Sequence, residues 1–162
     1  MSDRQTILGA VMGRVRRCLV RVTLLGLLAP VVAGAAVLAE PEARAVRQVV
    51  EAQLDAFAAN DAKRAFSYAS ASIRARFGDA DNFMAMVQSG YPMVVRPAAV
   101  SFFQAQADDG AEGAQAAVRQ AVQLRDREGR LWLATYLLER QDDAGWRING
   151  CVVVADSGRS ST

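Results

Sequence analysis

The chain has 162 residues, of which 52% are hydrophobic and 22% charged, with 19 basic and 17 acidic side chains. This composition fits one globular domain plus an additional apolar segment, and the scattered arginines give no reason to expect nucleic-acid binding. Histidine is absent from the sequence. That excludes histidine triads, histidine metal sites and the commonest general base.

The additional apolar segment lies near the N-terminus. Arg14, Arg16, Arg17 and Arg21 precede an uncharged run over residues 22–39, which ends in small residues before Glu40. Basic residues, an apolar run and small residues in this order are typical of a secretory signal. We therefore expect residues 1–39 to be a signal peptide and the domain to be periplasmic or secreted.

The same run has nearly the length of a membrane span, which is about 20 residues. An uncleaved anchor in the inner membrane, with the domain outside the cytoplasm, is therefore the alternative. In that case we expect the protein to contact the membrane only through residues 22–39. Without residues 1–39 the chain keeps 14 basic and 16 acidic residues, so the basic excess belongs to the precursor.

The two cysteines are expected to have different fates. Cys18 lies before the apolar run and is lost on cleavage, which leaves Cys151 alone and unable to form an internal disulfide. Cys151 lies in a valine-rich segment without a predicted helix terminus or a histidine to stabilise a thiolate. We interpret it as a small buried apolar residue, and a reactive thiol is the alternative.

The first half of the domain is predicted to be helical. Apolar and amide side chains recur at steps of three and four from residue 42, at Val46, Val49, Val50, Gln53, Leu54 and Phe57. Asn60 and Asp61 interrupt this pattern, and a second helix follows from Ala62 to Ala69.

Two shorter helical segments follow. A third turn pairs Ile73 with Phe77 before Gly78. Asp79 or Asp81 is expected to cap a further helix, which carries Phe83, Met86 and Val87 and stops at residues 90–92, Gly-Tyr-Pro. Three helices and a turn are therefore expected before any strand.

After Pro97 the period of the pattern changes to two, which indicates strands. We predict strands over residues 100–107, 114–125, 131–138 and 145–154, with Gly150 marking a bulge or a close backbone approach. The strand at 131–138 is apolar on both faces and is expected to be central. The tail 156–162 is expected to be disordered, which leaves residues 40–155 as one domain.

Helices followed by antiparallel strands predict an α+β domain, with the helices on one face of a curved antiparallel sheet of about four strands. Particular segments carry a closer resemblance: residues 53–57 (Gln-Leu-Asp-Ala-Phe), Tyr91, Trp132, residues 136–138 (Tyr-Leu-Leu) and above all residues 146–151 (Trp-Arg-Ile-Asn-Gly-Cys). Over about residues 44–154 the chain resembles the bacterial family catalogued as domain of unknown function 4864. The resemblance implies a cone-shaped, nuclear-transport-factor-2-like (cystatin-like) fold with a hollow at its open end, and it implies no activity.

Motifs for cofactors and metals are absent from the sequence. There is no P-loop, no G-x-G-x-x-G and no C-x-x-C. Residues 79–82 are similar to the start of a calcium loop, but Met84 stands where a glycine is needed and Gly90 where a bidentate glutamate belongs. We expect neither a cofactor nor a metal site.

Five polar residues are the candidates for contacts with a ligand. Gln120 has the inward register of its strand, and Tyr136 is expected to face inward from the next one. Tyr91, Tyr68 and Asp55 complete the candidates. Satisfied polar groups of the core or its rim are the ordinary interpretation of such residues, and no spacing among them selects a catalytic pair.

These observations lead to three hypotheses about function. The first is a non-catalytic module of the cell envelope that binds a small apolar or amphipathic ligand, or a protein. The second is an isomerase- or dehydratase-like enzyme that uses a tyrosine and an aspartate in the hollow, as the fold resemblance allows. The third is a structural homodimer formed through the outer face of the sheet, for which an exposed apolar patch would be the sign.

Overall fold

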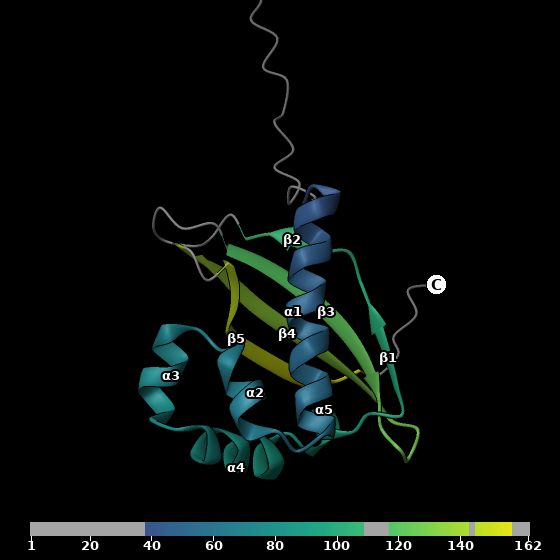
Figure 1. Ribbon diagram of the computed structural model, residues 1–162. Helices are drawn as coiled ribbons and strands as arrows, with labels where there is room; N and C mark the ends of the chain where they lie inside the picture. Colours follow the sequence, from purple (N-terminus) through teal and green to yellow (C-terminus); the bar gives the residue numbers. More distant parts are fainter. Residues whose placement is uncertain (1–37, 109–116, 143–144, 157–162) are drawn as a thin grey trace, which may run out of the picture. The chain divides into compact units, whose positions relative to one another are not determined.

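Helices precede strands along the chain, as expected (Figure 1). In this computed structural model the described residues are 38–108, 117–142 and 145–156. They form the helices α1 (Glu40–Ala58), α2 (Ala62–Ser67), α3 (Ala71–Phe77), α4 (Ala80–Gly90) and α5 (Pro92–Val95). They also form the strands β1 (Ala99–Phe102), β2 (Gln106–Ala107), β3 (Ala117–Arg125), β4 (Leu131–Gln141) and β5 (Gly145–Ala155).

Three predictions concern residues outside this set. The signal segment up to residue 37, the start of the strand predicted at 114 and the tail from residue 157 all lie outside the described residues. Within the described part, no helix combines the length and the apolar character that crossing a membrane requires.

Side-chain caps start three of the helices. Asp61 accepts a hydrogen bond from the Arg64 amide at 3.0 Å, and Asp79 accepts one from the Asn82 amide at 2.8 Å. Ser70 does the same for α3. Such caps satisfy amide groups that the first helical turn leaves unpaired. The expectation that an aspartate at 79–82 caps a helix is confirmed for Asp79.

The sheet is antiparallel, curled and open, and its helices pack on one face (Figure 1). The strand order is β1-β3-β4-β5, and β2 also pairs with β3. β4 is central, as its two apolar faces predicted. The α+β prediction is confirmed, with one difference: the segment predicted as a single strand over 100–107 is divided into β1 and β2, which gives five strands rather than about four.

A bulge divides that segment. Phe102 pairs with Val122, whereas Gln106 pairs with Arg119, so three residues on one side oppose two on the other. One extra residue interrupts a ladder and leaves backbone groups without their usual partners. The Gln120 side chain replaces a missing donor, because its Nε2 donates to the Phe103 carbonyl at 2.7 Å.

A second bulge lies in β5. Leu138 pairs with Ile148 and Leu137 with Gly150, so Asn149 has no partner in β4. The prediction of a bulge at Gly150 is therefore confirmed, with Asn149 as the extra residue. A close backbone approach is not the reason for the glycine, since the position of a Cβ on Gly150 has no neighbour within 4 Å.

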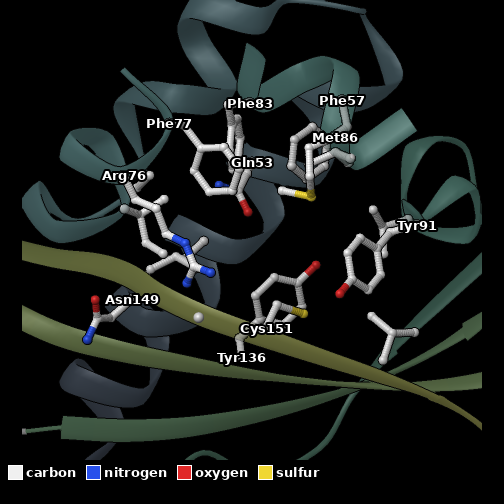
Figure 2. A pocket seen from close by; sticks show the side chains of 17 residues that line it. Gln53, Phe57, Arg76, Phe77, Phe83, Met86, Tyr91, Tyr136, Asn149 and Cys151 are labelled. Carbon is white, nitrogen blue, oxygen red and sulfur yellow. The ribbon is translucent and has the colours of Figure 1, made fainter. Parts of the chain in front are cut away.

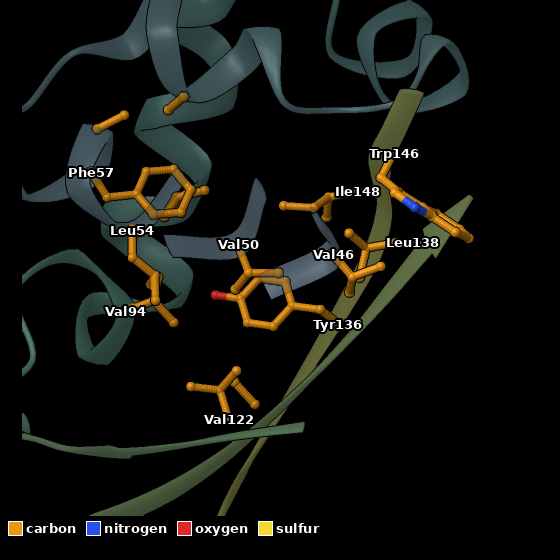
Figure 3. Packing of buried hydrophobic residues seen from close by; sticks show 14 of the residues in the cluster. Val46, Val50, Leu54, Phe57, Val94, Val122, Tyr136, Leu138, Trp146 and Ile148 are labelled. Carbon is orange, nitrogen blue, oxygen red and sulfur yellow. The ribbon is translucent and has the colours of Figure 1, made fainter. Parts of the chain in front are cut away.

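The core lies between α1 and the face of the sheet that the helices cover, called here the inner face. Figure 3 shows Val46, Val50 and Leu54 of α1 packed toward Tyr136 and Leu138 of β4. This one-sided burial explains the three- and four-residue spacing of the α1 apolar side chains.

An aromatic cluster joins the helices to one another. The Phe83 ring centre lies 5.4 Å from that of Phe66, 5.5 Å from that of Phe77 and 6.0 Å from that of Phe57. Aromatic rings at these separations and inclinations attract one another. Phe83 therefore connects α1, α2, α3 and α4.

Asp126 organises the turn between β3 and β4. Its Oδ1 accepts from the Glu128 and Arg130 amides, at 3.1 and 2.8 Å, and its Oδ2 accepts from Arg130 Nε at 2.8 Å and Trp132 Nε1 at 2.9 Å. Burial raises the pKa of this carboxyl, but the hydrogen bonds from Trp132 and Arg130 outweigh burial and bring the pKa below its ordinary value.

Candidate ligand-binding cavity

A cavity of about 490 Å³ lies between the helices and the inner face of β4 and β5 (Figure 2). This volume is within the range of small-molecule sites. The described residues that line it are Gln53, Phe57, Ala69, Ile73, Arg76, Phe77, Phe83, Met86, Val87, Tyr91, Val94, Tyr136, Ile148, Asn149, Gly150, Cys151 and Val153.

Most of the wall is apolar, and the aromatic cluster supplies much of it. Phe83 is in ring contact with Phe57 and with Phe77, and Met86 lies beside these rings (Figure 2). These side chains form a wall and leave the hollow open. The cavity therefore suits an apolar surface of a ligand.

Gln53 is the polar side chain that α1 contributes. It is 3% exposed, and its Nε2 donates to the Ala65 carbonyl at 3.2 Å. The Oε1 atom, in contrast, accepts no hydrogen bond from any residue that the structure describes, and it points into the cavity (Figure 2). A nearly buried acceptor is therefore available to whatever enters.

Two tyrosine hydroxyls also point into the cavity (Figure 2). Tyr136 comes from the inner face of β4 and is buried. Tyr91 lies between α4 and α5, where Pro92 begins a new helix, and its ring is partly exposed. Burial raises the pKa of Tyr136 well above its ordinary value, so its hydroxyl is a neutral donor or acceptor over the whole physiological range.

Cys151 stands opposite Tyr136 on β5, and the thiol and the hydroxyl are hydrogen-bonded. Burial raises the pKa of Cys151 to about 12, although the hydrogen bond from Tyr136 acts in the opposite direction. Because the thiolate is the nucleophile, a thiol with this pKa is inert at neutral pH. Cys151 behaves as the expected packing residue, with one side on the cavity.

Arg76 reaches toward β5 from α3 (Figure 2). The helix is held against β5 at its start, because the Ser70 amide donates to the Ile148 carbonyl at 2.8 Å and the Ile148 amide donates to the Tyr68 carbonyl at 2.9 Å. Gly78, with φ of 77°, ends the helix in a conformation that glycine adopts readily. A short, fixed helix thus presents the guanidinium to the cavity.

Asn149 completes this side of the cavity. Its Oδ1 accepts from Ser70 Oγ at 2.8 Å and from Ser72 Oγ at 2.6 Å. The bulge in β5 turns the side chain toward these serines. They occupy the amide oxygen, so the Nδ2 donor is the part of the side chain still available.

The predicted candidates divide into two groups. Tyr136 and Tyr91 line the cavity, whereas Gln120, Tyr68 and Asp55 are not among its lining residues. Gln120 is 1% exposed and donates to two backbone carbonyls, those of Phe103 and Ala121. Tyr68 hydrogen-bonds to Arg64 at the end of α2, and Asp55 is exposed on α1.

Three polar lining residues, Gln53, Arg76 and Asn149, were not among the sequence candidates. Gln53 carried a signal, since an amide interrupts an otherwise apolar helical stripe. Arg76 and Asn149 carried none, because their roles depend on contacts between distant segments. Among the described residues no carboxylate lines the cavity and no group of histidines, cysteines or acids could hold a metal.

The region that forms these helices and strands matches a known protein family. Residues 39–161 match the family described as Domain of unknown function (DUF4864). The chain belongs to this family. The matched region contains every helix and strand described above, so the described lining residues of the cavity all lie within it. A search of curated proteins finds no match.

Proposed function

We propose that this domain binds a small amphipathic molecule in the cavity and does not transform it chemically. The observation that carries the proposal is the Gln53 amide oxygen, which is nearly buried, faces the cavity and has no partner among the described residues. The fully enclosed side-chain atom without a partner in the described chain is Arg147 Nε, not Gln53 Oε1, so the Gln53 oxygen is accessible from the cavity. A ligand that donates a hydrogen bond to it would gain about 1 kcal/mol.

The surroundings of Gln53 support binding rather than catalysis. Acid–base chemistry needs a group that changes protonation near the working pH. Tyr136 and Cys151 have raised pKa values and keep their protons at neutral pH. Asp55, the acid of the enzyme hypothesis, is exposed and lies outside the cavity lining.

The compartment is part of the proposal. We propose an exported domain, because residues 14–39 have the pattern of a secretory signal. N-terminal sequencing of the envelope fraction should find a chain that starts near Ala36 or Glu40. A full-length chain in the cytosol would contradict export.

Fluorescence titration with N-phenyl-1-naphthylamine tests the binding site. This neutral probe has an apolar body and one N–H donor, and we expect saturable binding with one site per chain. Gln53→Leu should weaken binding by about 5-fold, as the loss of one hydrogen bond of roughly 1 kcal/mol implies. The same variant should unfold at about the same urea concentration without probe, because it removes the unpaired oxygen together with the Nε2 hydrogen bond to the Ala65 carbonyl, which also accepts from the Tyr68 amide.

Two further variants complete the test. Val153→Phe adds bulk to the cavity wall and should abolish saturable binding. Gln123→Leu makes the same change as Gln53→Leu outside the cavity lining and should leave probe affinity unchanged. Equal probe affinity in the wild type, Gln53→Leu and Val153→Phe would defeat the proposal.

A homodimer is the second candidate, and exposed valines favour it. Val152 and Val154 on β5 are 66% and 52% exposed, and they pair with Thr135 and Leu133 on the sheet face opposite the helices. Sedimentation velocity of the wild type and Val152→Glu tests this function. A concentration-dependent dimer that Val152→Glu dissociates would support it, and a monomer at all concentrations would exclude it.

A further inference from the structure

We infer that the ligand of this cavity is an amphipathic organic anion, with its carboxylate or similar group beside Arg76. This inference rests on the proposed function and adds the chemical class of the ligand. It is drawn from the charge and the hydrogen-bonding groups of the lining.

Arg76 gives the cavity a positive charge that nothing else in the described lining balances. It is the one charged residue among the described lining residues, and within the described chain its guanidinium has no ion pair or hydrogen bond. Two other arginines, Arg130 and Arg140, are in contrast paired with Asp126 and Glu42. A guanidinium has five donors in a fork that fits a carboxylate.

The neighbouring polar groups have the same preference. The Oδ1 of Asn149 is occupied by Ser70 and Ser72, so this amide offers its N–H group. Tyr136 keeps its proton and donates it to Cys151, so this hydroxyl places no negative charge beside the ligand. An arginine and an amide N–H, with no acidic residue among the described lining residues, complement an acceptor with negative charge.

The apolar wall determines the rest of the ligand. The helical side of the cavity carries Phe77, Phe83 and Met86. In Figure 2, Gln53 lies between Phe77 and Met86, and Arg76 lies at the end of the cavity away from Met86. A molecule with its anionic group at Arg76 would place its apolar body on these side chains. A hydroxyl or N–H group on that body would then be able to reach the Gln53 oxygen.

A matched pair of probes tests the charge. 8-Anilinonaphthalene-1-sulfonate is N-phenyl-1-naphthylamine with one added sulfonate, so the two differ in a single anionic group. We expect the wild type to bind the sulfonate about 5-fold more tightly than the neutral probe, a modest preference because Arg76 is exposed to solvent. Raising the salt concentration should reduce this preference by screening.

The variants assign the preference to one side chain. Arg76→Gln should bind both probes with equal affinity, whereas Arg74→Gln, which removes a charge from the same helix outside the cavity lining, should keep the preference. In competition, octanoate should displace the sulfonate probe from the wild type at lower concentration than 1-octanol does. Arg76→Gln should lose this difference too.

The outcomes separate the two proposals. If the wild type binds both probes equally well and Arg76→Gln changes nothing, the cavity binds amphipathic molecules and the inference about charge is wrong. If Arg74→Gln loses the preference as fully as Arg76→Gln, a general effect of surface charge replaces the site. If neither probe binds the folded wild type, the proposed function and this inference both fail.

Discussion

Replacing Gln120 with leucine tests whether this amide has a structural role. Gln120 Nε2 donates to Phe103 O at 2.7 Å and to Ala121 O at 2.9 Å. The Ala121 carbonyl keeps a second partner in Gln120→Leu, because the Phe103 amide also donates to it at 3.0 Å. The Phe103 carbonyl, which the bulge removes from the regular ladder, has no replacement donor among the described residues.

The loss is therefore about one hydrogen bond plus part of the cost of an unpaired acceptor, or roughly 2 kcal/mol of unfolding free energy. For a chain of this size that corresponds to a fall in Tm of roughly 8 °C. Urea unfolding followed by circular dichroism measures the difference. Affinity for the naphthylamine probe should not change, because Gln120 is not among the residues that line the cavity.

Gln123→Leu is the matched control, since it makes the same substitution on the same strand. In the wild type, Gln123 is partly exposed and its Nε2 donates to Asp156 Oδ2 at 2.8 Å. We expect a loss of at most about 1 kcal/mol, because solvent replaces a partner there. Equal stability of Gln120→Leu and the wild type, or weaker probe binding by Gln120→Leu, would refute the structural role of Gln120.

Two further predictions concern groups with shifted pKa values. Cys151 should react slowly with a maleimide in the folded protein at pH 7 and rapidly after denaturation, because its pKa of about 12 leaves almost no thiolate; fast labelling of the folded protein would contradict this. Asp126→Asn should lower stability at pH 7, and the difference from the wild type should shrink as the pH falls below about 4. The sign follows from the lowered pKa, since the stabilisation by the charged carboxylate is complete above the unfolded pKa and is lost as the pH falls through the folded pKa; a difference that is the same at pH 7 and pH 3 would contradict it.

The sequence predicts the elements of this fold well because their signals are local. The α1 stripe, the Asp79 cap and the central position of β4 follow from spacing and residue type within short windows. The division between β1 and β2 does not, because a bulge depends on the register of two strands that are distant in sequence. The pattern of residues 100–107 alone is equally compatible with one continuous strand.

The cavity shows the same limit. The inward register of Tyr136 follows from alternation along one strand, and burial confirms it. The inward register of Gln120 is equally sound, yet the side chain is occupied by the backbone of the bulge, which alternation cannot reveal. Arg76 reaches the cavity because α3 is attached to β5 through contacts between residues 70 and 148, and no local pattern encodes such a contact.

The bulge at Asn149 determines which residues of β5 face the cavity and which face solvent. Before it the even-numbered Trp146 and Ile148 are buried, and after it the odd-numbered Cys151 and Val153 line the cavity while Val152 is exposed. Because residues 152–154 are all valine, the hydrophobic pattern there does not distinguish the observed register from one shifted by one residue. A regular ladder that included Asn149 as a paired residue would exchange the two faces beyond it, with Val152 turned inward and Cys151 turned outward. Deleting Asn149 would instead remove the bulge and leave Gly150 opposite Leu137 and Cys151 opposite Tyr136, so the cavity wall would keep its residues.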